Sequence, residues 1–489
     1  MKFFNPLVLT SITPLIGVFI LFLIPSTNEV LCRRVALWFS CLCFLFSLII
    51  WIQFDSFTSI FQFSETFIWF PALNIYYTIG IDGISLFLIL LTTLLIMICI
   101  LVSWESIQFA IKDYLICFLL LEFILIQVFS VLDLLLFYIY FESVLIPMFL
   151  IIGIWGSRIR KIRAAFQFFL YTLVGSLLML VALLFIYLEV GSTDMQILWH
   201  TNFTEIRQLF LWLAFFSSFA IKIPMIPFHI WLPEAHAEAP TAGSVILAGV
   251  LLKLGGYGFL RFTLPMFPMA SVYFSPLIYT LSLIATIYAS LTTLRQIDLK
   301  KIIAYSSVSH MGFVTIGIFS FNIQGVEGSV LLMLSHGLVS SALFLSIGVL
   351  YDRYKTRIIK YYSGLTQVMP IFTSFFLFFS FCNLGFPGTS SFIGELLILI
   401  SAYKISSCLT FLVSLSMILA AAYSIWLFNR ISFGTLKVHY ISLFQDISRR
   451  EFFIFVPLVI LILYMGIYPA LFLNEIHFSV LNLLEQLVY

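Results

Sequence analysis

Apolar runs long enough to cross a bilayer follow one another along almost the whole chain. A membrane-spanning helix needs about 20 mainly apolar residues, so the pattern predicts about 14 spans. The longest polar stretch, about 54–80, is too short for a separate soluble domain. We therefore expect an all-α polytopic membrane protein with a single membrane domain, 1–489. The predicted spans lie near 7–24, 35–53, 83–103, 114–132, 134–155, 165–189, 208–232, 241–262, 272–293, 301–320, 327–350, 370–400, 406–428 and 452–473.

Two of the predicted spans contain residues that break helices. The seventh contains Pro224 and Pro227, each of which removes a helix hydrogen bond. The twelfth contains Gly385, Pro387 and Gly388. Breaks at corresponding places in two halves are typical of transporters built from inverted repeats, although ordinary membrane helices also contain proline kinks.

The two breaks define the predicted repeats. Spans 4–8 (114–262) and spans 9–13 (272–428) each contain five helices, and the fourth helix of each group is the discontinuous one. Because five is an odd number, the second group begins on the opposite side of the membrane and is inverted. N-terminal helices are expected over 1–113 and a C-terminal helix over 429–489.

Lysine and arginine are concentrated in alternate loops. Loops after even-numbered spans contain few cations, namely Arg207, Arg261 and Lys404. By the positive-inside rule, this alternation predicts that both termini lie on the non-cytoplasmic side, which is the intermembrane space in a mitochondrion. Loops after odd-numbered spans contain Arg33, Arg34, Lys112, Arg158, Arg160, Lys161, Arg163, Arg295, Lys300, Arg353, Lys355, Arg357, Lys360, Arg430, Lys437, Arg449 and Arg450.

Composition narrows the possible functions. Charged residues make up 9% of the chain, against about 25% in soluble domains, and the net charge of +2 does not suggest nucleic acid as a partner. None of the seven cysteines forms a CxxC pair, so we expect no zinc or iron–sulfur site. The chain has no nucleotide-binding or nucleophile motif. Energy for any transport must therefore come from a partner or a second ion gradient.

Six of the ionisable residues inside predicted spans are candidate functional residues, because charge at that depth is costly and usually functional. Burial disfavours the charged forms of lysine and carboxylate, and histidine titrates near neutral pH, so together they favour proton transport. Two structural explanations remain open: a static buried pair of one acid with one lysine, and hydrogen-bonded core histidines. Glu122 fits no motif, and we assign it no role. The six residues are Glu142, Lys222, Lys253, Glu395, His310 and His336, and the static pair would be Glu142 with Lys222.

A polar stretch between spans seven and eight raises the question of a metal site. It runs from His229 to Ser244 and contains two histidines and two glutamates. It has no HExxH pattern, and prolines interrupt the helix that such ligands need. A polar, water-lined bend at the end of a half-helix is the better interpretation.

Several motifs resemble the antiporter-like subunits of respiratory complex I, over nearly the whole chain. Within that family the mitochondrial type fits best, because Glu395 stands where sister subunits are expected to have lysine. The length leaves no room for the long lateral helix of the sister subunit 5. The motifs are Phe141-Glu142, Lys222-Ile223-Pro224, His229-Ile230-Trp231-Leu232-Pro233-Glu234-Ala235-His236, Ala239-Pro240-Thr241-Ala242-Gly243-Ser244, Leu247-Ala248-Gly249-Val250-Leu251-Leu252-Lys253, Asp298-Leu299-Lys300-Lys301-Ile302-Ile303-Ala304-Tyr305-Ser306-Ser307 and Ser335-His336-Gly337.

The resemblance implies a role for each candidate residue. Glu142 would be the coupling acid, Lys222 the central proton carrier and Lys253 the relay lysine. Glu395 would be the output acid, with His310 and His336 between. Proton translocation would be coupled to NADH oxidation and ubiquinone reduction in partner subunits.

The resemblance also implies a location and partners. The chain would be a core membrane-arm subunit of a translocating NADH:ubiquinone reductase in the mitochondrial inner membrane. NADH, FMN, iron–sulfur clusters and ubiquinone would be held by partner subunits, with no cofactor in this chain. Expected partners are neighbouring antiporter-like subunits, the lateral helix of subunit 5 and lipid. The alternatives are a subunit of a multisubunit cation/proton antiporter and a purely structural membrane scaffold.

Overall fold

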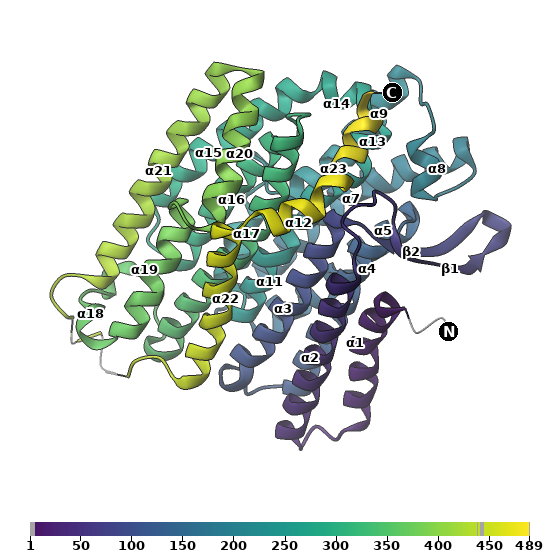
Figure 1. The fold of residues 1–489 in the computed structure, drawn as a ribbon. Helices are drawn as coiled ribbons and strands as arrows, with labels where there is room; N and C mark the ends of the chain where they lie inside the picture. Colours follow the sequence, from purple (N-terminus) through teal and green to yellow (C-terminus); the bar gives the residue numbers. More distant parts are fainter. Residues whose placement is uncertain (1–4, 438, 441–444, 489) are drawn as a thin grey trace.

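The computed structural model describes residues 5–437, 439–440 and 445–488 as a bundle of helices (Figure 1). Each predicted span corresponds to one helix or to a broken helix. They are α1 (Pro6–Leu23), α2 (Glu29–Gln53), α3 (Gly83–Ser106), α4 (Ile111–Ser130), α5 with α6 (Leu134–Ser143 and Leu145–Trp155), α7 (Lys161–Val190), α9 with α10 (Glu205–Lys222 and Trp231–Glu238), α11 to α13 (Thr241–Met266), α15 (Ser275–Arg295), α16 (Leu299–Ile318), α17 (Ile323–Tyr354), α19 with α20 (Pro370–Leu384 and Ser390–Ile405), α21 (Ser407–Ser432) and α22 (Arg449–Ile467).

Eleven of these spans are long and apolar enough to cross a membrane by length and composition. The other three predicted spans are the broken pairs α9–α10 and α19–α20, and α16, which begins with two lysines. The prediction of an all-α polytopic membrane protein is thus confirmed. The centre of the bundle is formed by α17 and by the α11–α13 segment, whose side chains are buried from 325 to 350 and from 241 to 266.

Both predicted helix breaks are present. Helix α9 ends at Lys222, and the indole N–H of Trp231 donates to the carbonyl of Ile221 that the break leaves free (3.0 Å). Helix α19 ends where Gly385 takes up a left-handed conformation with φ +78°, which glycine adopts without steric cost. The fourth helix of each five-helix group is therefore discontinuous.

Two irregularities were not predicted. The fifth span divides at Val144 into α5 and α6, because Pro147 cannot donate to the carbonyl of residue 143. The eighth span contains two π-helical segments, Leu247–Leu251 and Phe259–Thr263, on either side of α12 (Leu252–Gly258). Such segments occur often at functional sites.

The polar stretch 54–80, for which no secondary structure was predicted, contains an antiparallel hairpin. Strand β1 (Gln62–Phe70) pairs with β2 (Ile75–Ile81), with Thr66 opposite Thr78. A short helix, α8 (Met195–Trp199), and α14 (Pro268–Tyr273) also lie between spans. The all-α description therefore holds for the membrane part, and the hairpin is an addition outside it.

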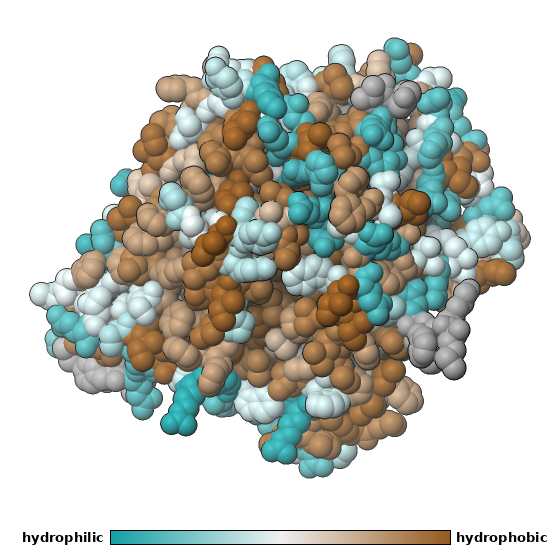
Figure 2. All heavy atoms as spheres, in the orientation of Figure 1, coloured by the Kyte–Doolittle hydropathy of each residue, from teal (hydrophilic) through white to brown (hydrophobic). Residues whose placement is uncertain are grey.

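The C-terminal region contains two helices instead of the one predicted over 429–489. Helix α22 ends at Ile467, and α23 (Ala470–Val488) begins just after Pro469, which favours a helix start and not a continuation. Figure 1 shows α23 crossing the front of the bundle over α17. Hydrophilic side chains gather on this face where α23 runs, whereas apolar ones cover most of the remainder (Figure 2). The predicted span 452–473 was therefore too long at its end.

The loops rich in cations meet at one end of the bundle. Lys112 donates to the carbonyls of Phe22 and Ile24, and Arg450 pairs with Glu105 at 2.9 Å. At the opposite end the Asn482 side chain of α23 reaches the carbonyl of Ser59, near the hairpin. The cation-rich loops, which alternate with cation-poor loops along the sequence, thus lie together at one end of the molecule.

A buried ion pair holds the hairpin end of the bundle together. Arg261 donates to both carboxylate oxygens of Asp82 at 2.9 and 2.5 Å and lies against the rings of Phe61, Trp199 and Tyr257. Burial by itself raises the pKa of Asp82, but Arg261 outweighs it and leaves that pKa below its usual value. The carboxylate therefore stays charged near neutral pH.

Replacing Asp82 with asparagine should sharply reduce the amount of folded protein. Breaking a buried pair leaves an uncompensated charge on Arg261, at a cost of about 3–5 kcal/mol. The matched control is Glu189→Gln, because the Glu189–Arg207 pair is exposed and such pairs contribute about 0–1 kcal/mol. Thermal inactivation and the level of assembled protein measure both variants. Equal levels in the two would contradict a stabilising role for the buried pair.

Candidate functional site

Lys222 lies at the broken end of α9, with 3% of its surface exposed. Helix C-termini carry partial negative charge, so a cation is favoured there. Its Nζ stands 4.3 Å from the centre of the Phe141 ring, an arrangement that stabilises an ammonium group. The break in the helix and the aromatic face together explain how a lysine is kept at membrane depth.

Glu142 is next to Phe141, one residue before the end of α5. Within the described residues, neither Glu142 Oε1 nor Lys222 Nζ has a hydrogen-bond partner. No direct hydrogen bond thus joins these two atoms, although the two side chains lie within electrostatic range of each other. Lys222 lies against the phenyl ring, and both atoms retain hydrogen-bonding capacity.

Lys253 is completely buried just after the first π-helical segment. Its Nζ donates to the carbonyl of Ala248 at 2.6 Å and lies 2.9 Å from His336 Nδ1. The backbones approach closely here, since a Cβ on Gly337 would stand 3.1 Å from the carbonyl oxygen of Gly249. Two residues far apart in the chain thus meet through small neighbours.

His310 and Glu395 form the other end of the site. His310 Nδ1 lies 3.3 Å from Glu395 Oε1, and both side chains are nearly inaccessible. The broken loop between α19 and α20 packs on the same carboxylate, since a Cβ on Gly385 would stand 2.5 Å from Glu395 Oε2. The break therefore makes room for the acid.

Four of the six candidates form one row. The rings of His336 and His310 are 5.6 Å apart, which joins Lys253 at one end to Glu395 at the other. Lys222 and Glu142 stand outside this row. Helix α9 does pack closely on α12, since a Cβ on Gly255 would stand 3.1 Å from the backbone nitrogen of Ile223.

Two further buried groups lie between this row and the cation-rich end. Lys300, counted above as a loop cation, is 2% exposed and donates to the carbonyl of Ala239 at 2.7 Å. His236 is fully buried, stacks on Phe344 at 4.7 Å and lies within electrostatic range of Lys300 and Lys253. Both belong to motifs quoted above, but no sequence pattern distinguishes a buried lysine at a helix start from an exposed one.

The His229–Ser244 stretch is mostly helical, because it contains α10 and the start of α11. Its residues do not gather into a metal site: among the described residues, no three His, Cys, Asp or Glu side chains form a group that could hold a metal ion. Glu122, unassigned above, is fully buried in α4, and its carboxylate oxygens have no partner within the described chain.

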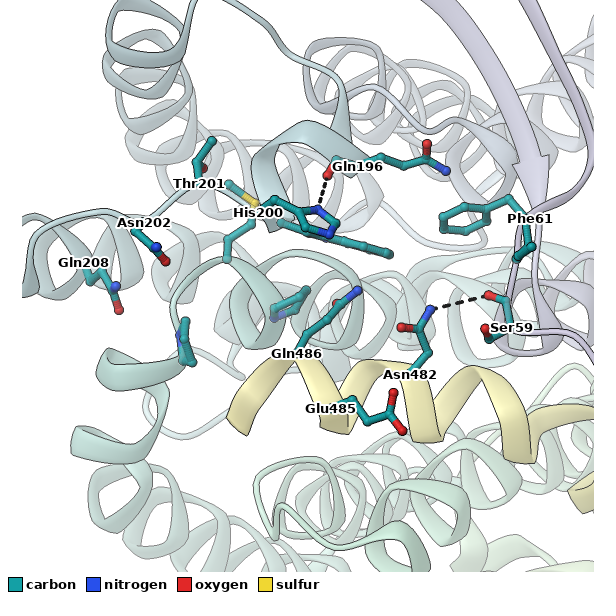
Figure 3. A pocket seen from close by; sticks show the side chains of 15 residues that line it. Ser59, Phe61, Gln196, His200, Thr201, Asn202, Gln208, Asn482, Glu485 and Gln486 are labelled. Carbon is teal, nitrogen blue, oxygen red and sulfur yellow. Dashed lines mark hydrogen bonds between the residues drawn. The ribbon is translucent and has the colours of Figure 1, made fainter. Parts of the chain in front are cut away.

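A surface cavity lined by polar side chains lies away from the row. Figure 3 shows it between α8, α23 and the start of the hairpin, where His200, Asn482 and Gln486 face it. None of the six candidate residues lines it. This surface cavity is therefore not the site at which the buried groups act.

Comparisons with known proteins agree on one family. Residues 131–420 match the family model for the transmembrane part of NADH:quinone oxidoreductase and Mrp antiporters. NADH-ubiquinone oxidoreductase chain 4 of Chondrus crispus is 79% identical over 485 residues, which cover 99% of each chain. A chain of respiratory complex I from Thermus thermophilus with bound NADH has a TM-score of 0.88 at 30% identity, over 98% of this chain and 99% of that one.

The same fold occurs in a different assembly. A chain of the Mrp complex from Dietzia has a TM-score of 0.84 at 17% identity, over 98% of this chain and all of that one. At this identity the likeness concerns the fold alone.

Proposed function

This chain belongs to the NADH:quinone oxidoreductase/Mrp antiporter membrane family, in its complex I chain 4 group, and from that premise we propose that it moves protons across the mitochondrial inner membrane. It does so as a core membrane-arm subunit of NADH–ubiquinone oxidoreductase. The observation that carries the proposal is the row Lys253–His336–His310–Glu395, which places four titratable groups in succession in a buried part of the bundle.

Each side chain of the row can accept a proton and pass a proton to the next. Lys253 Nζ donates toward His336 Nδ1. A histidine ring has two nitrogens, so one can accept a proton while the other donates one. Glu395 accepts at the far end, where the α19–α20 break frees backbone groups that water lines readily. A proton entering at Lys253 therefore leaves at Glu395 through short transfers.

Glu142 and Lys222 would act before the row, as the switch that loads it. A carboxylate near a lysine favours the charged ammonium, and a carboxylate farther away favours proton release. Because no hydrogen bond fixes one to the other, a small movement of α5 relative to α9 changes their separation. Phe141 and Glu142 both lie on α5, so such a movement also changes the contact between Lys222 and the Phe141 ring. His236 and Lys300 supply the approach from the cation-rich end.

The energy for this movement would come from partner subunits. Driving one charge against 100 mV costs about 2.3 kcal/mol. We propose that NADH, FMN, iron–sulfur clusters and ubiquinone are bound by those subunits and that this chain carries no cofactor of its own.

The partners would contact apolar surface that a single chain leaves uncovered. At the hairpin, the apolar side chains of Phe67, Ile68 and Trp69 are 45, 77 and 43% exposed. Neighbouring exposed apolar side chains of this kind often mark a contact surface for a partner. We propose that neighbouring antiporter-like subunits cover such surfaces and that the lateral helix of subunit 5 runs along the bundle. A multisubunit cation/proton antiporter remains the alternative assembly. Native purification separates the two, because only a complex I subunit co-purifies with NADH oxidation activity.

Both termini should face the intermembrane space. The cation-rich loops gather at one end of the bundle, and that end faces the matrix by the positive-inside rule. Protease treatment of mitoplasts should therefore remove tags placed at either terminus and spare a tag placed in the 353–360 loop. Protection of a terminal tag in mitoplasts, with cleavage in inverted vesicles, would reverse the topology.

A further inference from the structure

A pair of titratable side chains joins α23 to α17, outside the row described above. His477 Nδ1 lies 2.6 Å from Glu327 Oε1. The His477 side chain is 43% exposed, whereas the Glu327 side chain is only 11% exposed. One member of the pair thus reaches the surface, and the other faces the interior of the bundle.

We propose that Glu327 and His477 form the site from which protons leave the chain on the side of the intermembrane space. The inference rests on the proposed function and on its topology, which places α23 on that side. In this arrangement Glu395 passes its proton to Glu327, and His477 delivers it to bulk water.

The backbones of α17 and α20 bring Glu327 and Glu395 near each other. A Cβ on Gly328 would stand 3.2 Å from the carbonyl oxygen of Gly394, and each glycine is the direct chain neighbour of one of the two glutamates. With about 3.8 Å between consecutive Cα atoms, the Cα atoms of the glutamates lie within about 15 Å. Two extended glutamate side chains and a few water molecules bridge such a gap.

The same end of α17 offers a polar lining for that water. A Cβ on Gly325 would stand 1.9 Å from Ser320 Oγ and 2.7 Å from Ser401 Oγ. Both hydroxyl groups thus lie close to the backbone of Gly325, near the start of α17. Each donates to a backbone carbonyl, Ser320 to that of Gly317 and Ser401 to that of Ile398, and each oxygen can still accept a hydrogen bond from water.

The transfer balances in protons and charge. The neutral carboxyl of Glu395 gives its proton through water to the Glu327 carboxylate. Neutral Glu327 then protonates Nδ1 of the neutral His477 ring, which forms an imidazolium. That ring loses one proton to bulk water and becomes neutral again, and Glu327 is a carboxylate ready for the next proton.

Charged and polar side chains lie on α23, which carries His477, and on the neighbouring helix α20. On α23, Glu475 is partly buried, and burial, with Asp55 nearby, raises its pKa. On α20, Lys404 is bound to Gln324 Oε1 at 2.9 Å. Ser479 accepts from the backbone N–H of Gly83 and keeps α23 on the bundle. The Ser479 contact thus holds α23 on the bundle independently of the Glu327–His477 pair.

The test measures the initial rate of NADH-driven proton pumping per assembled complex in vesicles. His477→Gln keeps a hydrogen-bonding side chain that does not titrate near neutral pH, and Glu327→Gln does the same for the acid. We expect each to slow pumping about tenfold, which is less than the roughly 10²–10⁴-fold that acid–base groups typically contribute. His200→Gln is the matched control, because His200 is an exposed histidine in the cavity beside α23, and it should pump normally.

Chemical rescue distinguishes a role of His477 in proton release from a purely structural contact between α23 and α17. Added imidazole should restore pumping in His477→Ala but not in Glu327→Gln. Normal pumping per complex in His477→Gln overturns the inference, as does a His477→Ala defect that imidazole leaves unchanged. If Lys253→Met stops pumping while these variants pump normally, only the release site is wrong. If Lys253→Met also pumps normally, the proposed function itself fails.

Discussion

Replacing Lys222 with alanine is expected to slow NADH-driven proton pumping about tenfold or more at equal complex content, because it removes the group that loads the row. Losing the contact of Lys222 with Phe141 costs about 0.5–2 kcal/mol. Glu142 loses the electrostatic attraction of the lysine but can take up a proton and become neutral. The complex should therefore still assemble. Pumping is measured in sealed vesicles, with complex content determined on native gels.

Glu142→Ala should produce the same defect, since both groups are needed for loading. The matched control for Lys222 is Lys355→Ala: Lys355 is exposed and lies 5.9 Å from the Tyr351 ring, so it too loses a cation–ring contact. That variant should pump normally. Normal assembly with normal pumping in Lys222→Ala would remove the lysine from the mechanism.

Glu395→Gln is expected to damage pumping more than Glu395→Asp, with assembly unchanged in both. Glutamine preserves the size and the hydrogen bonding of the side chain beside His310 and Gly385 but cannot ionise. Aspartate keeps the charge and shortens the side chain by one methylene group, which weakens the 3.3 Å contact with His310. The readout is protons pumped per NADH oxidised.

If Glu395 only packs helices, the order should reverse, with aspartate the harsher change. Glu205→Gln provides a control, because Glu205 is exposed at the start of α9. Its pumping should equal that of the unmodified complex. Wild-type pumping in Glu395→Gln would leave that acid with a structural role alone.

Much of the membrane fold follows from local sequence properties. Apolar length predicts the spans, and prolines or glycines predict both discontinuous helices, because these effects act within one or two helical turns. The hairpin β1–β2 escaped prediction because its strands pair with each other and not with a periodic core. The Tyr468–Pro469 break was hidden inside a continuous apolar run.

The candidate residues were identified because an ionisable side chain is energetically costly within a membrane span. Their spatial arrangement was not predictable from the sequence. Lys253 and His336 are separated by 83 positions and meet only through the π-helical segment and the close approach of Gly249 to Gly337. Composition likewise does not distinguish a buried cation such as Lys300 from an exposed one. The sequence thus shows which ionisable residues lie within membrane spans, whereas tertiary packing determines which of them contact each other.

The most direct test of the proton row is the number of protons pumped per NADH oxidised in Lys253→Met. Methionine fills a similar volume without a charge, so the buried site should remain packed. We predict that pumping through this subunit stops, whereas Lys404→Met, which alters an exposed lysine bound to Gln324, leaves the ratio unchanged. An unchanged ratio in Lys253→Met, at normal complex content, would contradict the proton row.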